Sequence, residues 1–393
     1  MSTKSKVFFM YSPEFVKFCS LLPTNAINKD DDEDDKRNNR SYLVHNLIHA
    51  YGLFNNMTLV RPKEATKEDL IKFHTKPYID AIIQLDQQND SSDSDDEIQD
   101  KREFGLVDDA HYFKGIYSYI CNVAGGSISA ARMVMINRDK CPVAFNWEGG
   151  RHHARAGKAF GFCYVNDVVL CSIELLRAFK RVLIIDIDVH HGDGVEEAFY
   201  STDRAMTVSI HQYGQGLYPG TGDPDSIGRG RGVGYNVNIA LQEGASDEVY
   251  VSLFEDVVIN CCVNKFKPDC IVLVCGADSL TGDPLGHLNV SVAGYERCAR
   301  MIKNLNLPTV VLGAGGYNAP NTARCFATVT AAFLTDEPLP DDIPEHDFYE
   351  FYSDNGFKRN TRLSKRKDYN TKESINILKT KLISNIETHI KQL

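Results

Sequence analysis

Long apolar runs, CxxC cysteine pairs and an excess of basic charge are all missing from this sequence of 393 residues. No run approaches the ~20 apolar residues that cross a bilayer, and the apolar run Val7–Met10 is too short for a signal-peptide core. We therefore expect a soluble, intracellular protein without a membrane partner. The eleven cysteines include no CxxC pair, which is typical of buried free thiols in a reducing compartment.

Basic residues are outnumbered, with 43 Lys and Arg against 53 Asp and Glu and a net charge of −10. Proteins that bind nucleic acid usually present a basic face, so we expect no direct nucleic-acid contact. The negative charge is compatible with a cationic partner, although solubility alone would also explain it. Two acidic loops are expected near 28–39 and 86–102, and a basic, solvated extension near 355–393.

Apolar runs rich in β-branched residues alternate with amphipathic runs from Gly115 onward. This alternation indicates a sheet with helices on both faces. We predict one α/β domain over residues 1–393, with three α/β/α layers around a central, mostly parallel sheet. The expected strands are Val143–Trp147, Val182–Val189, Met206–Ile210, Ile271–Cys275 and Thr309–Leu312. The expected helices are Arg40–Phe54, Asn166–Phe179, Tyr250–Phe266, Val290–Asn304, Thr322–Leu334 and Lys372–Gln392.

Carboxylates and histidines appear where the strand Val182–Val189 ends. Alternate side chains of a strand share one face, so Asp186, Asp188 and His190 lie on the same side if the strand stays extended. Two buried carboxylates beside an imidazole are costly unless they are paired or bind a metal. A lone Asp-x-Asp could instead cap the following helix, but Asp193 makes the cluster too dense for that explanation.

Three more expected strands end in chemically capable residues, namely the pair His152–His153, Asp278 and Tyr317. Ligands of parallel sheets bind at the carboxyl ends of the strands. Three N/O ligands, Asp188, His190 and Asp278, fit a catalytic zinc with an open position, and Mn²⁺ or Fe²⁺ also suits them. Asp186 and Asp193 would orient the paired histidines, and Tyr317 would donate to an oxyanion. No P-loop lysine follows the glycine turn before Tyr317, which argues against nucleotide binding.

These residues lie in the motifs NWEGGRHHA, GFCYVNDV, DIDVHHGDGVEEAF, YPGTGD, GADSLTGDPLG and GAGGYN. From about Tyr42 to about Phe351 the sequence resembles the zinc-dependent histone deacetylases of class I. The segment Ile343–Phe348 and the short tail are most similar to the type-eight branch. The resemblance implies an arginase/deacetylase-like fold and hydrolysis of the acyl amide on the ε-nitrogen of lysine. It also implies Zn²⁺, with Fe²⁺ as the alternative metal, structural K⁺, and a place in the nucleus and cytoplasm.

The resemblance also assigns roles, residue by residue. The zinc ligands are Asp188, His190 and Asp278. The catalytic residues are His153 as general base, His152 as its electrostatic partner, their carboxylates Asp193 and Asp186, and Tyr317. The substrate residues are Asp109, Gly161, Phe162, Tyr218, Leu285 and His287, and Arg40 lines an internal channel. The potassium sites comprise Asp186, Asp188, His190, Ser209 and Ile210, and Phe199, Thr202, Ala205 and Tyr235.

Five positions depart from the family pattern and bear on selectivity: Arg151, Ala314, Leu285, His287 and Asp108. The implied partners are acetylated lysines in histone tails or other proteins, together with corepressor or cohesin-type proteins. Three alternatives remain: a two-manganese ureohydrolase, a polyamine- or acetoin-type deacetylase, and a catalytically silent reader of acyl-lysine.

Overall fold

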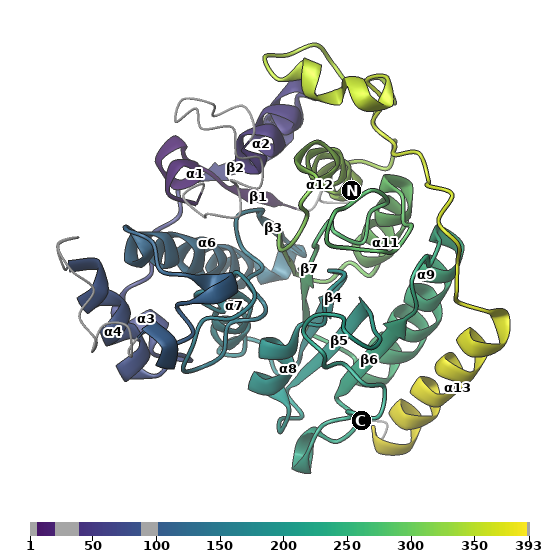
Figure 1. The fold of residues 1–393 in the computed structure, drawn as a ribbon, viewed down its shortest axis with the longest axis horizontal. Helices are drawn as coiled ribbons and strands as arrows, with labels where there is room; N and C mark the ends of the chain where they lie inside the picture. Colours follow the sequence, from purple (N-terminus) through teal and green to yellow (C-terminus); the bar gives the residue numbers. More distant parts are fainter. Residues whose placement is uncertain (1–5, 20–38, 88–100, 391–393) are drawn as a thin grey trace.

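A computed structural model describes residues 6–19, 39–87 and 101–390 (Figure 1). Within these residues eight strands form one fully parallel sheet in the order β2-β1-β3-β8-β7-β4-β5-β6. The strands are β1 (Val7–Met10), β2 (Thr58–Val60), β3 (Val143–Asn146), β4 (Val182–Asp186), β5 (Ala205–Gln212), β6 (Asn236–Leu241), β7 (Cys270–Val274) and β8 (Thr309–Leu312). The predicted α/β fold is confirmed.

Helices cover both faces of the sheet (Figure 1). The α-helices are α1 (Pro13–Cys19), α2 (Arg40–Ala50), α3 (Lys67–Leu70), α4 (Lys76–Gln87), α6 (Ile116–Ile136), α7 (Asp167–Leu175), α8 (Asp193–Phe199), α9 (Asp247–Leu253), α10 (Asn264–Phe266), α11 (Val292–Asn304), α12 (Ala319–Leu334) and α13 (Lys372–His389). Short 3₁₀ turns are η3 (Leu53–Asn56), η4 (Asp108–Ala110), η5 (Arg138–Lys140), η6 (Gly230–Gly232) and η8 (Tyr349–Asn355), and η7 (Phe254–Val263) is a π-helix.

Alternation along the central strands divides the core into two halves. In β4, Leu183 and Ile185 join the cluster under α9, α11 and α12, whereas Val182 and Ile184 join the cluster under α6 and α7. Because both faces are buried, the strand is apolar at every position until Asp186. Each such aliphatic side chain contributes roughly 1.5–3 kcal/mol by leaving water.

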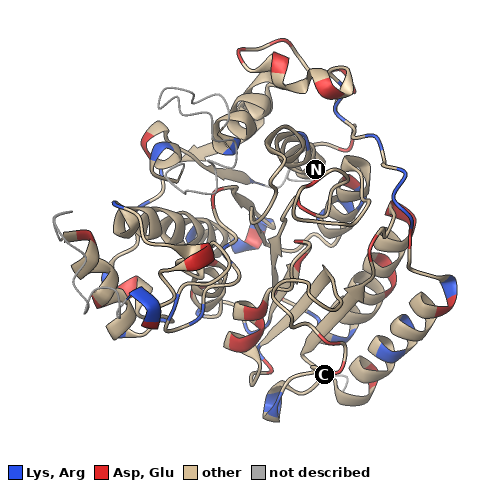
Figure 2. Cartoon of the chain, in the orientation of Figure 1, with Lys and Arg blue, Asp and Glu red and all other residues tan. Residues whose placement is uncertain are grey.

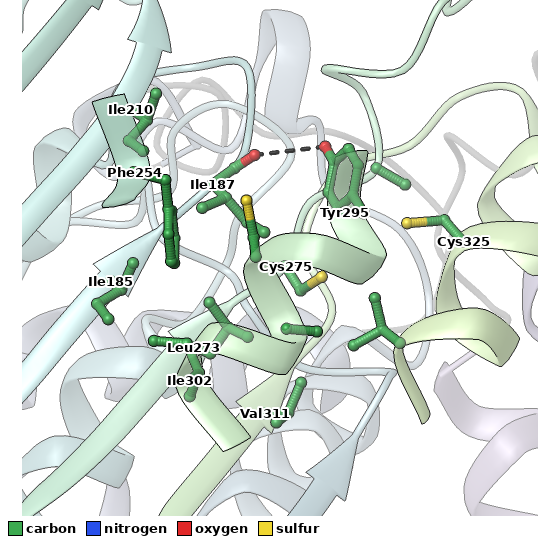
Figure 3. Packing of buried hydrophobic residues seen from close by; sticks show 14 of the residues in the cluster. Ile185, Ile187, Ile210, Phe254, Leu273, Cys275, Tyr295, Ile302, Val311 and Cys325 are labelled. Carbon is green, nitrogen blue, oxygen red and sulfur yellow. Dashed lines mark hydrogen bonds between the residues drawn. The ribbon is translucent and has the colours of Figure 1, made fainter. Parts of the chain in front are cut away.

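Helix α11 ties the core to the loops that follow the strands (Figure 3). Tyr295 donates a hydrogen bond to the carbonyl oxygen of Gly276 at 2.5 Å and lies 3.4 Å from that of Ile187. Cys275 and Cys325 lie in the same apolar cluster. All eleven cysteines are free and ten are buried, as the sequence indicated.

Several boundaries differ from the prediction. The expected strand Val182–Val189 ends at Asp186, so Asp188 and His190 lie in a loop and not on the face of an extended strand. The expected helix Tyr250–Phe266 is continuous, but its middle is π-helical. Strands β1, β2 and β6 were not predicted as strands.

Helix α6 qualifies the expectation about membrane spans. By length and composition alone it could cross a bilayer, but 78% of its most apolar window is buried inside the protein. Helix α6 packs on α7, α1, α4 and the sheet, so it is a core helix.

The two acidic loops lie mostly outside the described residues. The basic extension is described to residue 390 and is more than a solvated tail. Its segment 362–369 is exposed and rich in Lys and Arg (Figure 2), but α13 packs on η7 and β6, with Leu382 and Ile386 each 1% exposed. Upstream, Arg359 is buried and forms an ion pair with Glu296 at 2.8 Å.

Candidate active site

Four adjacent strands, β3, β8, β7 and β4, end at one edge and deliver the predicted residues there. The loop after β3 carries the histidine pair, and the loops after β8, β7 and β4 carry Tyr317, Asp278 and the segment 186–193. The turns pass very close together: a side chain at Gly150, whose φ is +93°, would come within 2.6 Å of the backbone nitrogen of Ala314. Glycine is therefore required where these loops cross.

Asp188, His190 and Asp278 converge as the sequence predicted, and one ligand atom from each lies within 4.8 Å of the others. His190 Nδ1 is 3.1 Å from Asp188 Oδ1 and 3.2 Å from Asp278 Oδ2. The second carboxylate oxygens are held by the backbone, because Gly315 N donates to Asp188 Oδ2 and Val189 N to Asp278 Oδ1, both at 2.8 Å. One oxygen of each carboxylate thus remains directed at the imidazole.

The charges of the two buried carboxylates favour binding of a cation by this trio. Asp188 and Asp278 are 1% and 0% exposed. Burial and the charge of Asp188 raise the pKa of Asp278 to about 7. Burial lowers the pKa of His190, but hydrogen bonds to the two carboxylates outweigh this effect and raise it to about 10. A bound divalent ion would neutralise both carboxylates in place of the proton that His190 otherwise carries. The one nitrogen and two oxygens of the trio suit zinc.

Each histidine of the pair has its own carboxylate. His152 Nδ1 lies 2.6 Å from Asp186 Oδ2, and His153 Nδ1 lies 2.7 Å from Asp193 Oδ1. Arg155 donates to the other oxygen of Asp193 at 2.8 Å. Burial raises the pKa of Asp193, but the hydrogen bond and charge of His153 and the charge of Arg155 lower it below its ordinary value overall.

The two imidazoles differ in charge although their centroids are only 4.0 Å apart. Burial lowers the pKa of His152, but the charges of Asp186 and Asp188 raise it to about 9. Burial and the positive charge of His152 lower the pKa of His153 to about 4. At neutral pH His152 is therefore protonated and His153 is neutral. With the Nδ1 proton of His153 directed at Asp193, its Nε2 can accept a proton.

A cavity of about 350 Å³ leads to these groups. Its lining includes Asp109, His153, Gly161, Phe162, Val189, His190, Gln212, Leu217, Tyr218, Leu285 and Tyr317. Tyr218 meets the ring of His153 edge-on at a centroid distance of 5.1 Å. Phe162 faces Tyr317 at 6.0 Å, and its backbone φ of +60° follows a glycine with φ of +55°. The aromatic rings and the small Gly161 make this cavity a narrow tunnel for an unbranched chain.

Two features fix the rim and the phenol. Asp109 accepts a hydrogen bond from Gly161 N at 3.3 Å, and burial raises the pKa of Asp109. The backbone N–H of Tyr317 donates to Asp283 at 2.8 Å. Burial raises the pKa of the Tyr317 phenol well above its ordinary value, so the phenol keeps its proton and acts as a donor.

A second cavity of about 490 Å³ adjoins the first. The two share His153, Gly161, Phe162 and Tyr317. Its further lining includes Arg40, Arg151, His152, Cys163, Asp188 and Ala314, and it reaches 318–320 at the start of α12. Arg40 thus lines an internal cavity, as the resemblance implied.

Comparison with known proteins decides the family. Residues 34–333 match the model described as the histone deacetylase domain. The chain is 43% identical to histone deacetylase RPD3 of Saccharomyces cerevisiae, covering 88% of this chain and 78% of that protein. It is 41% identical to histone deacetylase 1 of Homo sapiens and 42% identical to the probable histone deacetylase 1-A of Xenopus laevis. Each of these two covers 88% of this chain and 70% of the relative.

The chain belongs to the histone deacetylase family. Its predicted identity as a class I member and as a hydrolytic lysine deacetylase is thereby confirmed. The similarity to the type-eight branch stays a prediction.

Not every predicted residue of this deacetylase reaches a cavity. Leu285 lines the tunnel and is 42% exposed at its rim. His287 lines neither cavity; its backbone N–H donates to Gln212 at 3.0 Å instead. Asp108 is exposed, with a left-handed φ of +54°.

The predicted potassium residues lie on the β5 side of the site. Asp186 of β4 is in register with Ser209 of β5, and Ile210 follows. The second group surrounds the start of β5, where Thr202 N donates to the carbonyl of Phe199 at 3.2 Å. Ala205 begins β5, and Tyr235 precedes β6. Potassium binding at these two groups stays a prediction.

Sequence reasoning missed several residues that position the deacetylase site. Asp283 accepts from Tyr317 N and Leu285 N, and Asp167 accepts from Gly150 N at 2.9 Å. Both lie in motifs that carried the resemblance, which was the available signal. Arg155 had no such signal, because its contact with Asp193 spans 38 residues.

Proposed function

We propose that this lysine deacetylase binds one Zn²⁺ through Asp188, His190 and Asp278 and hydrolyses the acyl amide on lysine ε-nitrogen. The observation that carries the proposal is the convergence of this trio beside two joined cavities, which Asp188, His190, Tyr317 and the His153 of the His153–Asp193 pair line. Bound zinc would act as a Lewis acid on the acyl carbonyl and lower the pKa of the attacking water. Fe²⁺ could replace zinc at the same nitrogen and oxygen ligands.

His153 acts as the general base. Its neutral ring at neutral pH, with Asp193 fixing the Nδ1 proton, leaves Nε2 ready to take a proton from water. The same nitrogen then delivers the proton to the leaving amine. His152, held as a cation by Asp186, stabilises negative charge that develops beside it.

Tyr317 donates its phenolic proton in a hydrogen bond to the developing oxyanion. Its high pKa keeps it neutral, so it does not repel the oxygen. The aromatic walls from Phe162 and Tyr218 favour an uncharged acyl-lysine stem. The carboxylate of Asp109 at the rim is placed to accept hydrogen bonds from the substrate backbone.

Acetylated lysines of histone tails or other proteins are the proposed substrates, and the net charge of −10 favours basic peptides. On the same family grounds we propose corepressor or cohesin-type proteins as partners, and the nucleus and cytoplasm as the location. Structural K⁺ at the two groups around β5 would offset the crowded carboxylates next to the metal ligands.

The decisive experiment measures acetate release from an acetyl-lysine peptide by the purified chain. We expect release with Zn²⁺ bound, loss after a chelator and recovery when Zn²⁺ is restored. An N-acetylated polyamine serves as the competing substrate. Binding of the peptide without acetate release would favour a silent reader, and release from the polyamine alone would favour a small-molecule deacetylase. Either result overturns the proposal.

A further inference from the structure

The second cavity holds two guanidinium groups without a carboxylate partner. Arg151 is 7% exposed, and its Nε is buried with no hydrogen-bond partner. Its Nη2 donates only to the backbone oxygen of Glu148 at 3.3 Å. Arg40 donates to the backbone oxygens of Ala314 and Gly316 at 2.8 and 3.3 Å. Across the described ranges, no carboxylate lies within ion-pair distance of either arginine.

The acidic side chains whose charges act on Arg151 are already engaged elsewhere. Glu148 accepts from Ser41 at 2.7 Å and lies 3.0 Å from His45 Nε2. Asp167 accepts from Ser127, from Gly150 N and from the backbone N–H of Arg151. These carboxylates therefore offset the cavity's charge at a distance, and neither guanidinium group pairs with a carboxylate of the described residues.

Two further observations point to an anionic occupant. Burial and the charge of Arg151 lower the pKa of Arg40 overall, although the charge of Glu148 acts on both guanidinium groups in the opposite direction. The hydroxyl of Tyr119, also buried and without a hydrogen-bond partner, lies within electrostatic range of Arg151. Unpaired buried donors are costly, and a carboxylate matches the planar fork of an arginine.

The direction of the substrate places the acyl chain here. Lysine enters through the tunnel, and its acyl carbonyl must lie at the catalytic residues that both cavities share. The part of the acyl group beyond the carbonyl then extends into the second cavity. An acetyl group ends at its methyl, whereas a longer acyl chain reaches farther toward Arg151.

We propose that Arg151 and Arg40 bind a carboxylate at the distal end of the acyl group, so that the enzyme removes dicarboxylic acyl groups such as succinyl from lysine. The inference rests on the proposed function, because it uses the same catalytic centre. Water supplies the oxygen that bonds to the acyl carbon, the C–N bond breaks, and His153 returns the water proton to the lysine nitrogen. The products are a free dicarboxylate and unmodified lysine.

The test compares succinyl-lysine with butyryl-lysine in one peptide, since both acyl groups have four carbons and differ in the terminal carboxylate. In the wild type we expect the kcat/KM ratio of succinyl to butyryl to exceed one. Arg151→Met, similar in length but uncharged, is expected to lower this ratio by ~10-fold or more, the effect of losing a charge-assisted hydrogen bond. The ratio cancels any general loss of activity.

Arg151→Lys keeps the charge without the fork, so its ratio should fall between those of the wild type and Arg151→Met. It also provides the answer if Arg151→Met does not fold. An equal ratio in the wild type and the folded variants would overturn the inference.

Inhibition of the enzyme by free acetate and free succinate shows whether the cavity binds a free carboxylate or the carboxylate of a substrate's acyl group. If Arg151→Met weakens that inhibition but leaves the succinyl-to-butyryl ratio unchanged, the cavity holds only a free carboxylate and the inference fails. Should the zinc-loaded wild type hydrolyse none of the acetyl, butyryl and succinyl peptides, the proposed function itself fails.

Discussion

At the scale of single residues, the surrounding charges give chemically identical groups different roles. His152 and His153 are neighbours, yet pKa values of about 9 and about 4 give one a charge and leave the other neutral. The difference arises because the negative charges of Asp186 and Asp188 raise the pKa of His152, whereas the positive charge of His152 lowers the pKa of His153. Motif resemblance predicted these roles, but the split in charge depends on distances that only the folded chain shows.

Tyr317→Phe tests the oxyanion donor at this scale. The variant keeps the ring and loses only the hydroxyl, so we expect kcat to fall by ~10²-fold or more while the peptide Kd changes little. Steady-state kinetics and fluorescence-polarisation binding on an acetyl-lysine peptide measure the two effects. Turnover near that of the wild type would remove Tyr317 from the mechanism.

Ala314→Gly tests backbone strain beside the site. Ala314 has a φ of +108°, a conformation that glycine adopts far more readily than alanine. We expect the variant to raise the free energy of unfolding by about 1 kcal/mol, measured by urea denaturation. Ala130→Gly inside α6 is the control and should lower it by a similar amount. If the Ala314→Gly protein were less stable than the wild type, the claim that the backbone is strained at Ala314 would be wrong.

At the scale of elements, loops held between distant helices complete the tunnel. The turn η4 reaches Gly161 through Asp109, and the loop before α7 is held by His74, whose Nε2 accepts from Asn166 N at 3.0 Å. Runs such as β4 and β7, apolar on both faces, were predictable from sequence. Strand β6 was not, because its buried Asn236 and Asn238 serve a polar network with Glu196.

His74 makes stability depend on pH through these loops. Burial lowers its pKa from 6.5 to about 4. Above pH 6.5 the ring is neutral in both states. Between pH 6.5 and 4 the unfolded chain binds a proton that the folded chain does not, so the free energy of unfolding falls, by about 3 kcal/mol in total. His74→Gln should lose this component in urea titrations at pH 7 and pH 4. The same pH dependence in both proteins would show that His74 does not contribute.

Asp109→Ala tests the rim turn η4. Without the carboxylate the peptide backbone is held less well and Gly161 loses an acceptor, so kcat/KM for peptides should fall by ~10²-fold with zinc content intact. Asp109→Asn should be intermediate. Asp108→Asn is the control, since Asn tolerates the left-handed backbone there. Equal loss in the Asp108 variant would assign the role to charge near the rim in general.

At the scale of the whole molecule, the parallel sheet explains why residues as far apart in the sequence as His153 and Tyr317 share one site. The carboxyl ends of four neighbouring strands bring together the loops that carry His153, Asp188, Asp278 and Tyr317. Strand ends and motifs made this set predictable. The contact of Arg155 with Asp193 and the unpartnered Nε of Arg151 were not predictable, because they depend on how separate loops pack.

Zinc bound per chain, measured on the wild type, Asp188→Asn and His153→Ala by elemental analysis, tests the central claim most directly. The account predicts one zinc in the wild type, none in Asp188→Asn because one of three ligands is lost, and one in an inactive His153→Ala. Full zinc occupancy in Asp188→Asn, or loss of zinc in His153→Ala, would contradict the assignment of metal ligands and general base.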